Sequence, residues 1–196
     1  LGKEGLLRTE PRKGLVAALD ISLFAIVVLW VIFLLNFTLW GVDFKEYGIR
    51  PRTSVGLTGI VTSPLIHADI AHLTANTVGL FMLLTMAFSF SRTLAVLALF
   101  VIVFLGGSVV WIFGRSGASY IGASGVIFGL AGFLVGGGLF RGEWRAFLYT
   151  LLVLLFYGGI FTALFTTEPG VSTLSHTSGF VAGTTSAWMT RRMAKF

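Results

Sequence analysis

The sequence predicts an all-α, polytopic membrane protein: a six-transmembrane-helix bundle that forms a single domain over residues 1–196. Hydrophobic residues make up 56% of the chain and charged residues only 11%, whereas an average soluble domain carries about 25% charged residues. The mean hydropathy is +0.92. A helix needs roughly 20 apolar residues to cross about 30 Å of hydrocarbon. Six segments approach or exceed this length: residues 14–40, 66–90, 93–113, 122–140, 146–165 and 172–189.

The first segment follows a short charged stretch, residues 1–13. Its apolar run from Leu15 to Leu35 is longer than the core of a signal peptide and shows no small-x-small cleavage pattern, so we interpret it as the first span. The sequence contains no cysteine, which excludes disulfide bonds and cysteine-based metal sites.

Basic residues predict the orientation, because Lys and Arg in short loops are retained on the cytoplasmic side. With six spans both termini share one side. That side carries ten basic residues: Lys3, Arg8, Arg12, Lys13, Arg92, Arg141, Arg145, Arg191, Arg192 and Lys195. The other side carries four: Lys45, Arg50, Arg52 and Arg115. We therefore expect a multi-pass protein of the cell membrane, in contact with lipids, with both termini cytoplasmic. The scattered charge does not favour a nucleic-acid partner.

In this topology the second, fourth and sixth segments begin on the non-cytoplasmic side, and each carries polar residues there. These residues are His67, His72 and Asn76, then Ser124, and finally His176. Intramembrane polar residues are costly and tend to face one another or a water-filled cavity. The loop GRSGASY, residues 114–120, suits the wall of such a cavity, because non-helical backbone within a membrane needs water or protein around it. We expect a hydrated site open to the non-cytoplasmic face.

Ser124 permits two interpretations. A serine in a membrane helix commonly bonds to a carbonyl one turn earlier, and glycines four apart, such as Gly125 and Gly129, mark close helix packing. Near a helix N-terminus, however, free backbone N–H groups stabilise negative charge. A serine at that position is therefore also a candidate nucleophile.

Gly179 and Gly183 repeat the spacing of the glycines that follow Ser124. Paired small-residue grooves let helix backbones approach closely, and this pairing would bring Ser124 and His176 together. A lone histidine at a span entrance is commonly structural, but an imidazole with a pKa of about 6.5 is suited to take a serine proton. A Ser–His pair within hydrogen-bond reach forms a nucleophile and its base.

His72 and Asn76 lie one turn apart on one helical face. Two side-chain donors beside a serine can hold the negative oxygen of a tetrahedral intermediate; alternatively, they form an interhelical hydrogen-bonding pair. For His67 we expect an orienting or interfacial role.

Three motifs arrange these residues on the second, fourth and sixth segments: His72-x-x-x-Asn76, Gly122-Ala123-Ser124-Gly125 and His176-x-x-Gly179-x-x-x-Gly183. Together they resemble the signature of the rhomboid intramembrane serine proteases. The resemblance covers nearly the whole chain. It implies a protease without cofactor or metal that cleaves transmembrane segments of other membrane proteins through a Ser–His dyad.

By this resemblance Ser124 is the nucleophile, and His176 is the general base and later the acid. His72, Asn76 and the backbone N–H of Ser124 would form the oxyanion hole. Phe128 occupies the position of an aromatic ring that packs against the catalytic histidine. The supporting positions are Gly122, Gly125, Phe128, Gly179 and His67.

The family also has a first loop that lies partly in the outer leaflet, here residues 41–65, and a substrate gate at its fifth helix and the loop after it. Gly158-Gly159 and residues 166–172 suit such a gate, although two glycines in a span are equally suited to simple packing. The chain departs from the family in three ways. It has no Trp-Arg pair in the first loop, Ile121 replaces a common glycine, and Ser178 replaces another.

No acid is well placed to complete a triad: Asp20 lies at the cytoplasmic end of the first span, while Asp69 and Glu168 lie in or near outer loops. Three alternatives remain open. Three histidines can hold a catalytic zinc, a non-catalytic rhomboid-like protein can bind membrane clients, and a transporter can carry polar half-helix ends. Typical non-catalytic relatives lack the serine or the histidine, whereas this chain keeps both Ser124 and His176.

Overall fold

The computed structural model describes residues 11–38, 43–159 and 172–193. Within these residues the protein is helical, apart from turns, loops and one isolated β-bridge. The α-helices are α1 (Pro11–Thr38), α2 (Ser54–Thr62), α3 (Ile70–Phe90), α4 (Arg92–Val101), α5 (Gly107–Phe113), α6 (Ser124–Arg141), α7 (Trp144–Tyr157) and α9 (Thr173–Met189). A π-helical turn, Ile102–Gly106, joins α4 to α5, and 3-10 turns cover Phe44–Tyr47 and Ser63–Leu65.

Four of the described helical stretches are long and apolar enough to cross a membrane: Gly14–Asn36, Ile70–Phe90, Arg92–Phe113 and Ser124–Arg141. They make this an integral membrane protein. α7 and α9 are shorter, with 14 and 17 residues. The predicted fifth span continues to residue 165, and the predicted gate loop covers residues 166–172. Residues 160–171 lie outside the described residues, so four of the six predicted spans are supported.

Two predicted spans begin too early. Asp69 accepts a hydrogen bond from the backbone N–H of His72 and caps the N-terminus of α3, so residues 66–69 form a loop rather than the first turn of the second span. Gly122 has φ 109°, which is incompatible with a helix, so the fourth span begins at Ser124 instead of at residue 122. His67 therefore lies outside the membrane-spanning helix.

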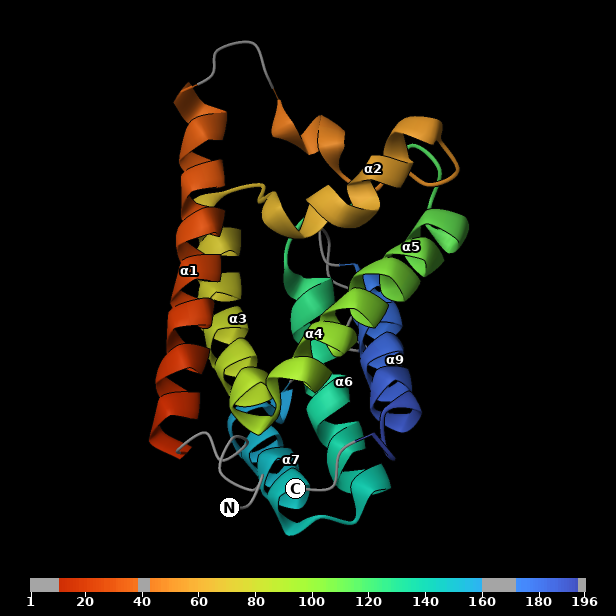
Figure 1. The fold of residues 1–196 in the computed structure, drawn as a ribbon. Coiled ribbons are helices and arrows are strands. Elements are labelled where there is room, and N and C mark those ends of the chain that lie inside the picture. The colour runs from red at the N-terminus through yellow and green to blue at the C-terminus, as the bar shows by residue number, and fades with distance from the viewer. Residues whose placement is uncertain (1–10, 39–42, 160–171, 194–196) are drawn as a thin grey trace, which may run out of the picture.

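α6 is the central helix of the bundle. Of its span, 61% of the residues are buried, compared with 28% in α1 and 22% in the span formed by α4 and α5. α3, α7 and α9 pack against α6, and α1 packs against α3. The α1–α3 contact contains two side-chain hydrogen bonds, from Trp30 to Thr77 and from Thr85 to Ser22. In Figure 1, α2 lies across one end of the bundle, whereas α1 begins and α9 ends at the other.

Candidate active site

The contact between α6 and α9 is a contact between backbones. A Cβ atom at Gly179 would overlap the carbonyl oxygen of Gly125, and a Cβ atom at Gly183 would overlap the carbonyl oxygen of Gly129. Only glycine allows this approach. The predicted pairing of the two glycine grooves is confirmed.

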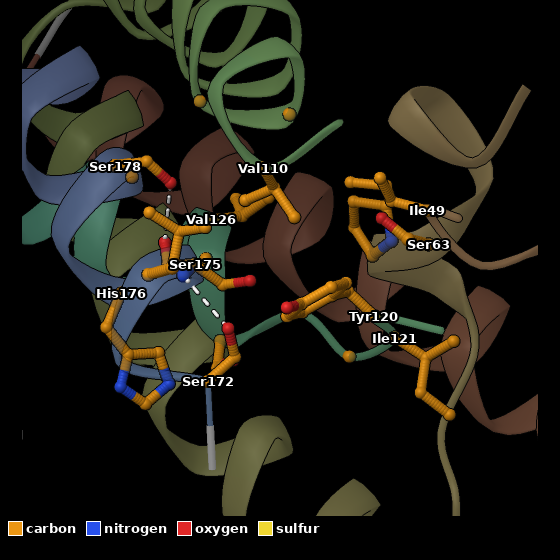
Figure 2. A pocket seen from close by; sticks show the side chains of 18 of the residues that line it. Ile49, Ser63, Val110, Tyr120, Ile121, Val126, Ser172, Ser175, His176 and Ser178 are labelled. Atoms are coloured by element: carbon orange, nitrogen blue, oxygen red, sulfur yellow. Dashed lines mark hydrogen bonds between the residues drawn. The ribbon is translucent and has the colours of Figure 1, made fainter. Parts of the chain in front are cut away.

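Ser124 and His176 line the same cavity, which has a volume of about 990 Å³. Ser124 is the first residue of α6, and His176 lies in the first turn of α9, whose N-terminus is capped by Ser172. The His176 side chain is buried, and its ring stacks on that of Phe128 with centroids 3.9 Å apart and planes 9° from parallel. This contact confirms the predicted aromatic neighbour of His176 and limits the orientations of the imidazole. Figure 2 shows His176, Ser172 and Ser175 on one side of the cavity and Tyr120 and Ile121 on another.

His72 and Asn76 approach the residue two positions before Ser124. A Cβ atom at Gly122 would lie 2.6 Å from the Cε1 and Nε2 atoms of His72 and 3.7 Å from Nδ2 of Asn76. Both side chains line the cavity that contains Ser124. Asn76 is 5% exposed, and its Nδ2 has no hydrogen-bond acceptor among the described residues. A buried donor without an acceptor costs about 1–3 kcal/mol, so this amide is available to an acceptor that enters the cavity.

His67 contacts the backbone between Gly122 and Ser124. Its Nε2 accepts a hydrogen bond from the N–H of Ala123 at 3.4 Å, and its ring meets that of His72 edge to face, with centroids 5.1 Å apart. Burial, and secondarily the charge of His72, lowers the pKa of His67 to about 4. The imidazole is thus neutral at pH 7, as an acceptor at Nε2 must be. These contacts place His67 where an orienting residue would lie.

The first loop holds the segment that precedes the serine. Ile49 and Tyr120 exchange backbone hydrogen bonds in an antiparallel bridge. The N–H of Gly122 donates to the carbonyl of Ser63 at 2.9 Å, and the Ser119 hydroxyl donates to the carbonyl of Lys45 at 2.8 Å. Residues 43–67 therefore form the surface against which residues 114–123 lie. The motifs in the sequence did not indicate these partners, because most of the bonds join backbone atoms.

The Rhomboid domain family model matches residues 54–193. The chain belongs to the rhomboid family. Uncharacterized proteins of Mycobacterium bovis and Mycobacterium tuberculosis are each 41% identical to this chain over 155 residues, which covers 72% of this chain and 62% of theirs. An uncharacterized protein of Mycobacterium leprae is 36% identical over 153 residues, covering 72% of this chain and 59% of that protein. This rhomboid chain therefore spans less than two thirds of the length of these relatives.

Two residues at which this rhomboid departs from the family pattern, Ile121 and Ser178, line the cavity. Ile121 lines the cavity, and its side chain lies close to Gly48. The Ser178 hydroxyl donates to the carbonyl of Ser175 at 3.2 Å, within its own helix. The first loop, which has no Trp-Arg pair, is tied to α5 by Trp111, whose indole N–H donates to the carbonyl of Thr53 at 2.9 Å.

Two of the three candidate acids, Asp69 and Asp20, lie in the described part of the chain. Asp69 caps α3 through the backbone N–H of His72, Asp20 is an exposed residue of α1, and Glu168 lies outside the described residues. In the described part of the chain, no group of three histidine, aspartate or glutamate side chains could hold a metal ion. Among these residues the zinc alternative therefore has no set of three ligands.

Proposed function

We propose that this rhomboid is an intramembrane serine endopeptidase that cleaves transmembrane segments of other membrane proteins. One observation carries the proposal: Ser124 and His176, from two helices in backbone contact, line one cavity together with the donors of His72 and Asn76. Nucleophile, base and anion-binding donors are the parts that acyl transfer needs.

In the proposed mechanism, the Ser124 hydroxyl attacks the carbonyl carbon of the scissile peptide while His176 accepts the hydroxyl proton. The negative oxygen of the tetrahedral intermediate accepts hydrogen bonds from Nδ2 of Asn76, from the His72 ring and from the backbone N–H of Ser124. The leaving amine takes the proton from His176. Water then attacks the acyl-enzyme with His176 again as base, and Ser124 is restored.

The cavity fits a reaction that consumes water inside a membrane. Its lining includes polar side chains such as Ser63, Ser119 and Ser175 beside apolar ones, whereas the outer helix faces carry exposed apolar residues such as Phe24 and Leu155. Lipid covers those faces in this proposal, and the cavity opens to the non-cytoplasmic side of the cell membrane. In this proposal the partner proteins are transmembrane substrates.

The test is fluorophosphonate labelling of the purified protein in detergent, together with cleavage of a single-span substrate. We expect the probe to label Ser124, and we expect Ser124→Ala and His176→Ala to abolish cleavage without lowering the unfolding temperature by more than a few degrees. A folded protein that neither reacts with the probe nor cleaves would contradict the proposal and support the client-binding alternative. Loss of cleavage on chelation with EDTA would support zinc.

A further inference from the structure

Arg52 has an unusual backbone conformation. Among the described residues it is the one non-glycine residue with positive φ, at 59°. Such a conformation is unfavourable for a residue with a side chain and persists where the surrounding contacts hold it. It lies immediately before Thr53, the residue that caps α2.

Three hydrogen bonds hold Arg52 against the end of α5. Its backbone N–H donates to the carbonyl of Trp111 at 3.1 Å, and Nη1 donates to the carbonyl of Ile112 at 2.6 Å. Nη2 donates to the hydroxyl of Ser116. A fourth hydrogen bond runs in the opposite direction between the same two segments, from the Trp111 indole N–H to the carbonyl of Thr53.

The location suits a guanidinium. α5 ends at Phe113, and the last four carbonyls of a helix have no partner within it. A positive charge is also favoured by the helix dipole at this end. Arg52 caps α5 from another part of the chain, and the planar fork of its guanidinium reaches Ile112 and Ser116 at once.

Ser116 belongs to the segment that leads to Ser124. Further along, residues 119–123 contact the first loop through Lys45, Ile49, Ser63 and His67. At the beginning of this segment, where the chain leaves α5, Arg52 attaches it to the α2 loop, and the backbone N–H of Arg115 donates to the Tyr120 hydroxyl at 2.8 Å within the segment itself. The bond from Arg115 stays within the segment, so without Arg52 residues 114–118 would lose their side-chain link to the α2 loop, and the backbone that carries the Ser124 N–H would be held less firmly.

We propose that Arg52 is a positioning residue for the nucleophile: by joining the α2 loop to Ile112 and Ser116, it fixes the segment from which α6 and Ser124 begin. This inference rests on the proposed protease function. Arg52 touches neither substrate nor reacting atoms in it, and it acts through the geometry of residues 114–123.

The experiment measures the rate at which a fluorophosphonate labels Ser124, per folded molecule, in variants of the full chain. We expect Arg52→Ala to slow labelling about 10-fold. We expect Arg52→Lys, which keeps the charge but not the fork, and Ser116→Ala, which removes one acceptor, to slow it about threefold each. The double variant Arg52→Ala/Ser116→Ala should be no slower than Arg52→Ala, because both changes remove the same contact.

Arg50→Ala is the matched control. Arg50 lies on the same loop and pairs with Glu46 at 3.8 Å, so its removal should leave labelling within twofold of the wild type. A second measurement is hydrogen exchange of the backbone amides in residues 116–123, which we expect to speed up in Arg52→Ala and not in Arg50→Ala.

Two results would overturn the inference: labelling of Arg52→Ala at the wild-type rate per folded molecule, or unchanged exchange in residues 116–123. If Arg52→Ala does not fold, Arg52→Lys and Ser116→Ala decide the same question. An unlabelled wild-type protein would count against the proposed function, while the exchange measurement would still decide whether Arg52 holds this segment.

Discussion

At the scale of single residues, Gly122 is constrained by both its backbone conformation and its neighbours in the candidate site. Its φ of 109° disfavours any side chain, and a Cβ atom there would collide with the His72 ring. Its N–H is bound to Ser63 and the next N–H to His67. Because Gly122 has no side chain, His72, His67 and the loop at Ser63 can all contact the backbone directly before Ser124.

We predict that Gly122→Ala nearly abolishes fluorophosphonate labelling, because the new methyl group displaces His72 as well as straining the backbone. Gly117→Ala is the matched control. Gly117 has φ 80°, but nothing lies within 4 Å of a Cβ atom there, so it carries the strain without the collision. It should retain most of the labelling rate. Equal losses in the two variants would mean that backbone strain alone, and not the contact with His72, is responsible.

Asn76 allows activity and stability to be separated. We predict that Asn76→Leu, which has a similar volume, lowers the rate of substrate cleavage about 10² to 10³-fold, the usual cost of losing one oxyanion donor. The unfolding temperature should stay level or rise, because the buried Nδ2 without an acceptor is removed. A fall in unfolding temperature with little loss of cleavage would assign Asn76 to the structure of the bundle.

At the scale of helices and loops, the sequence predicts some contacts and misses others for a physical reason. The α6–α9 pairing follows from glycine spacing, because only glycines permit backbone contact, and the stacking of Phe128 on His176 follows from the family pattern. The bridge between Ile49 and Tyr120 left no signal, since any residue can make backbone hydrogen bonds. The Arg52 contact joins residues 60 positions apart, and nothing near Arg52 marks its partner.

α7 is held to its neighbours unequally, which bears on the predicted gate. It packs chiefly on α6 and at fewer positions on α3. Near its end, the Tyr157 hydroxyl donates to the carbonyl of Val78 on α3 at 3.3 Å. We predict that Tyr157→Phe speeds cleavage of a single-span substrate about two- to fivefold. The change removes this bond across the α3–α7 contact and leaves the ring, so α7 should separate from α3 more easily when a substrate enters.

The matched control is Tyr149→Phe on the same helix. The Tyr149 ring packs edge to face on that of Phe90, with ring centroids 5.5 Å apart. This variant should leave cleavage unchanged. Labelling by a small fluorophosphonate should be unaffected in both variants, since a small probe does not need the helices to separate. Slower cleavage in Tyr157→Phe would show that this bond supports the active arrangement instead of restraining substrate entry.

At the scale of the whole molecule, the position of the cavity determines from which side water and substrate arrive in the proposed function. Its lining includes Ile60 of α2 together with Ser63 and Asp69, so it lies at the end of the bundle that α2 covers. α1 begins and α9 ends at the opposite end (Figure 1). The charge distribution in the sequence predicts that this opposite end faces the cytoplasm.

The absence of cysteine makes this orientation directly testable, because a single introduced cysteine is the only thiol in the chain. We predict that a membrane-impermeant maleimide labels Arg115→Cys in intact cells, and labels Met193→Cys only after the membrane is permeabilised. Both side chains are exposed, and they lie at the cavity and just beyond α9, respectively. An impermeant fluorophosphonate should label Ser124 in intact cells, as the maleimide labels Arg115→Cys. Labelling of Met193→Cys from outside would reverse the topology and place the cavity on the cytoplasmic side, where it would receive different substrates.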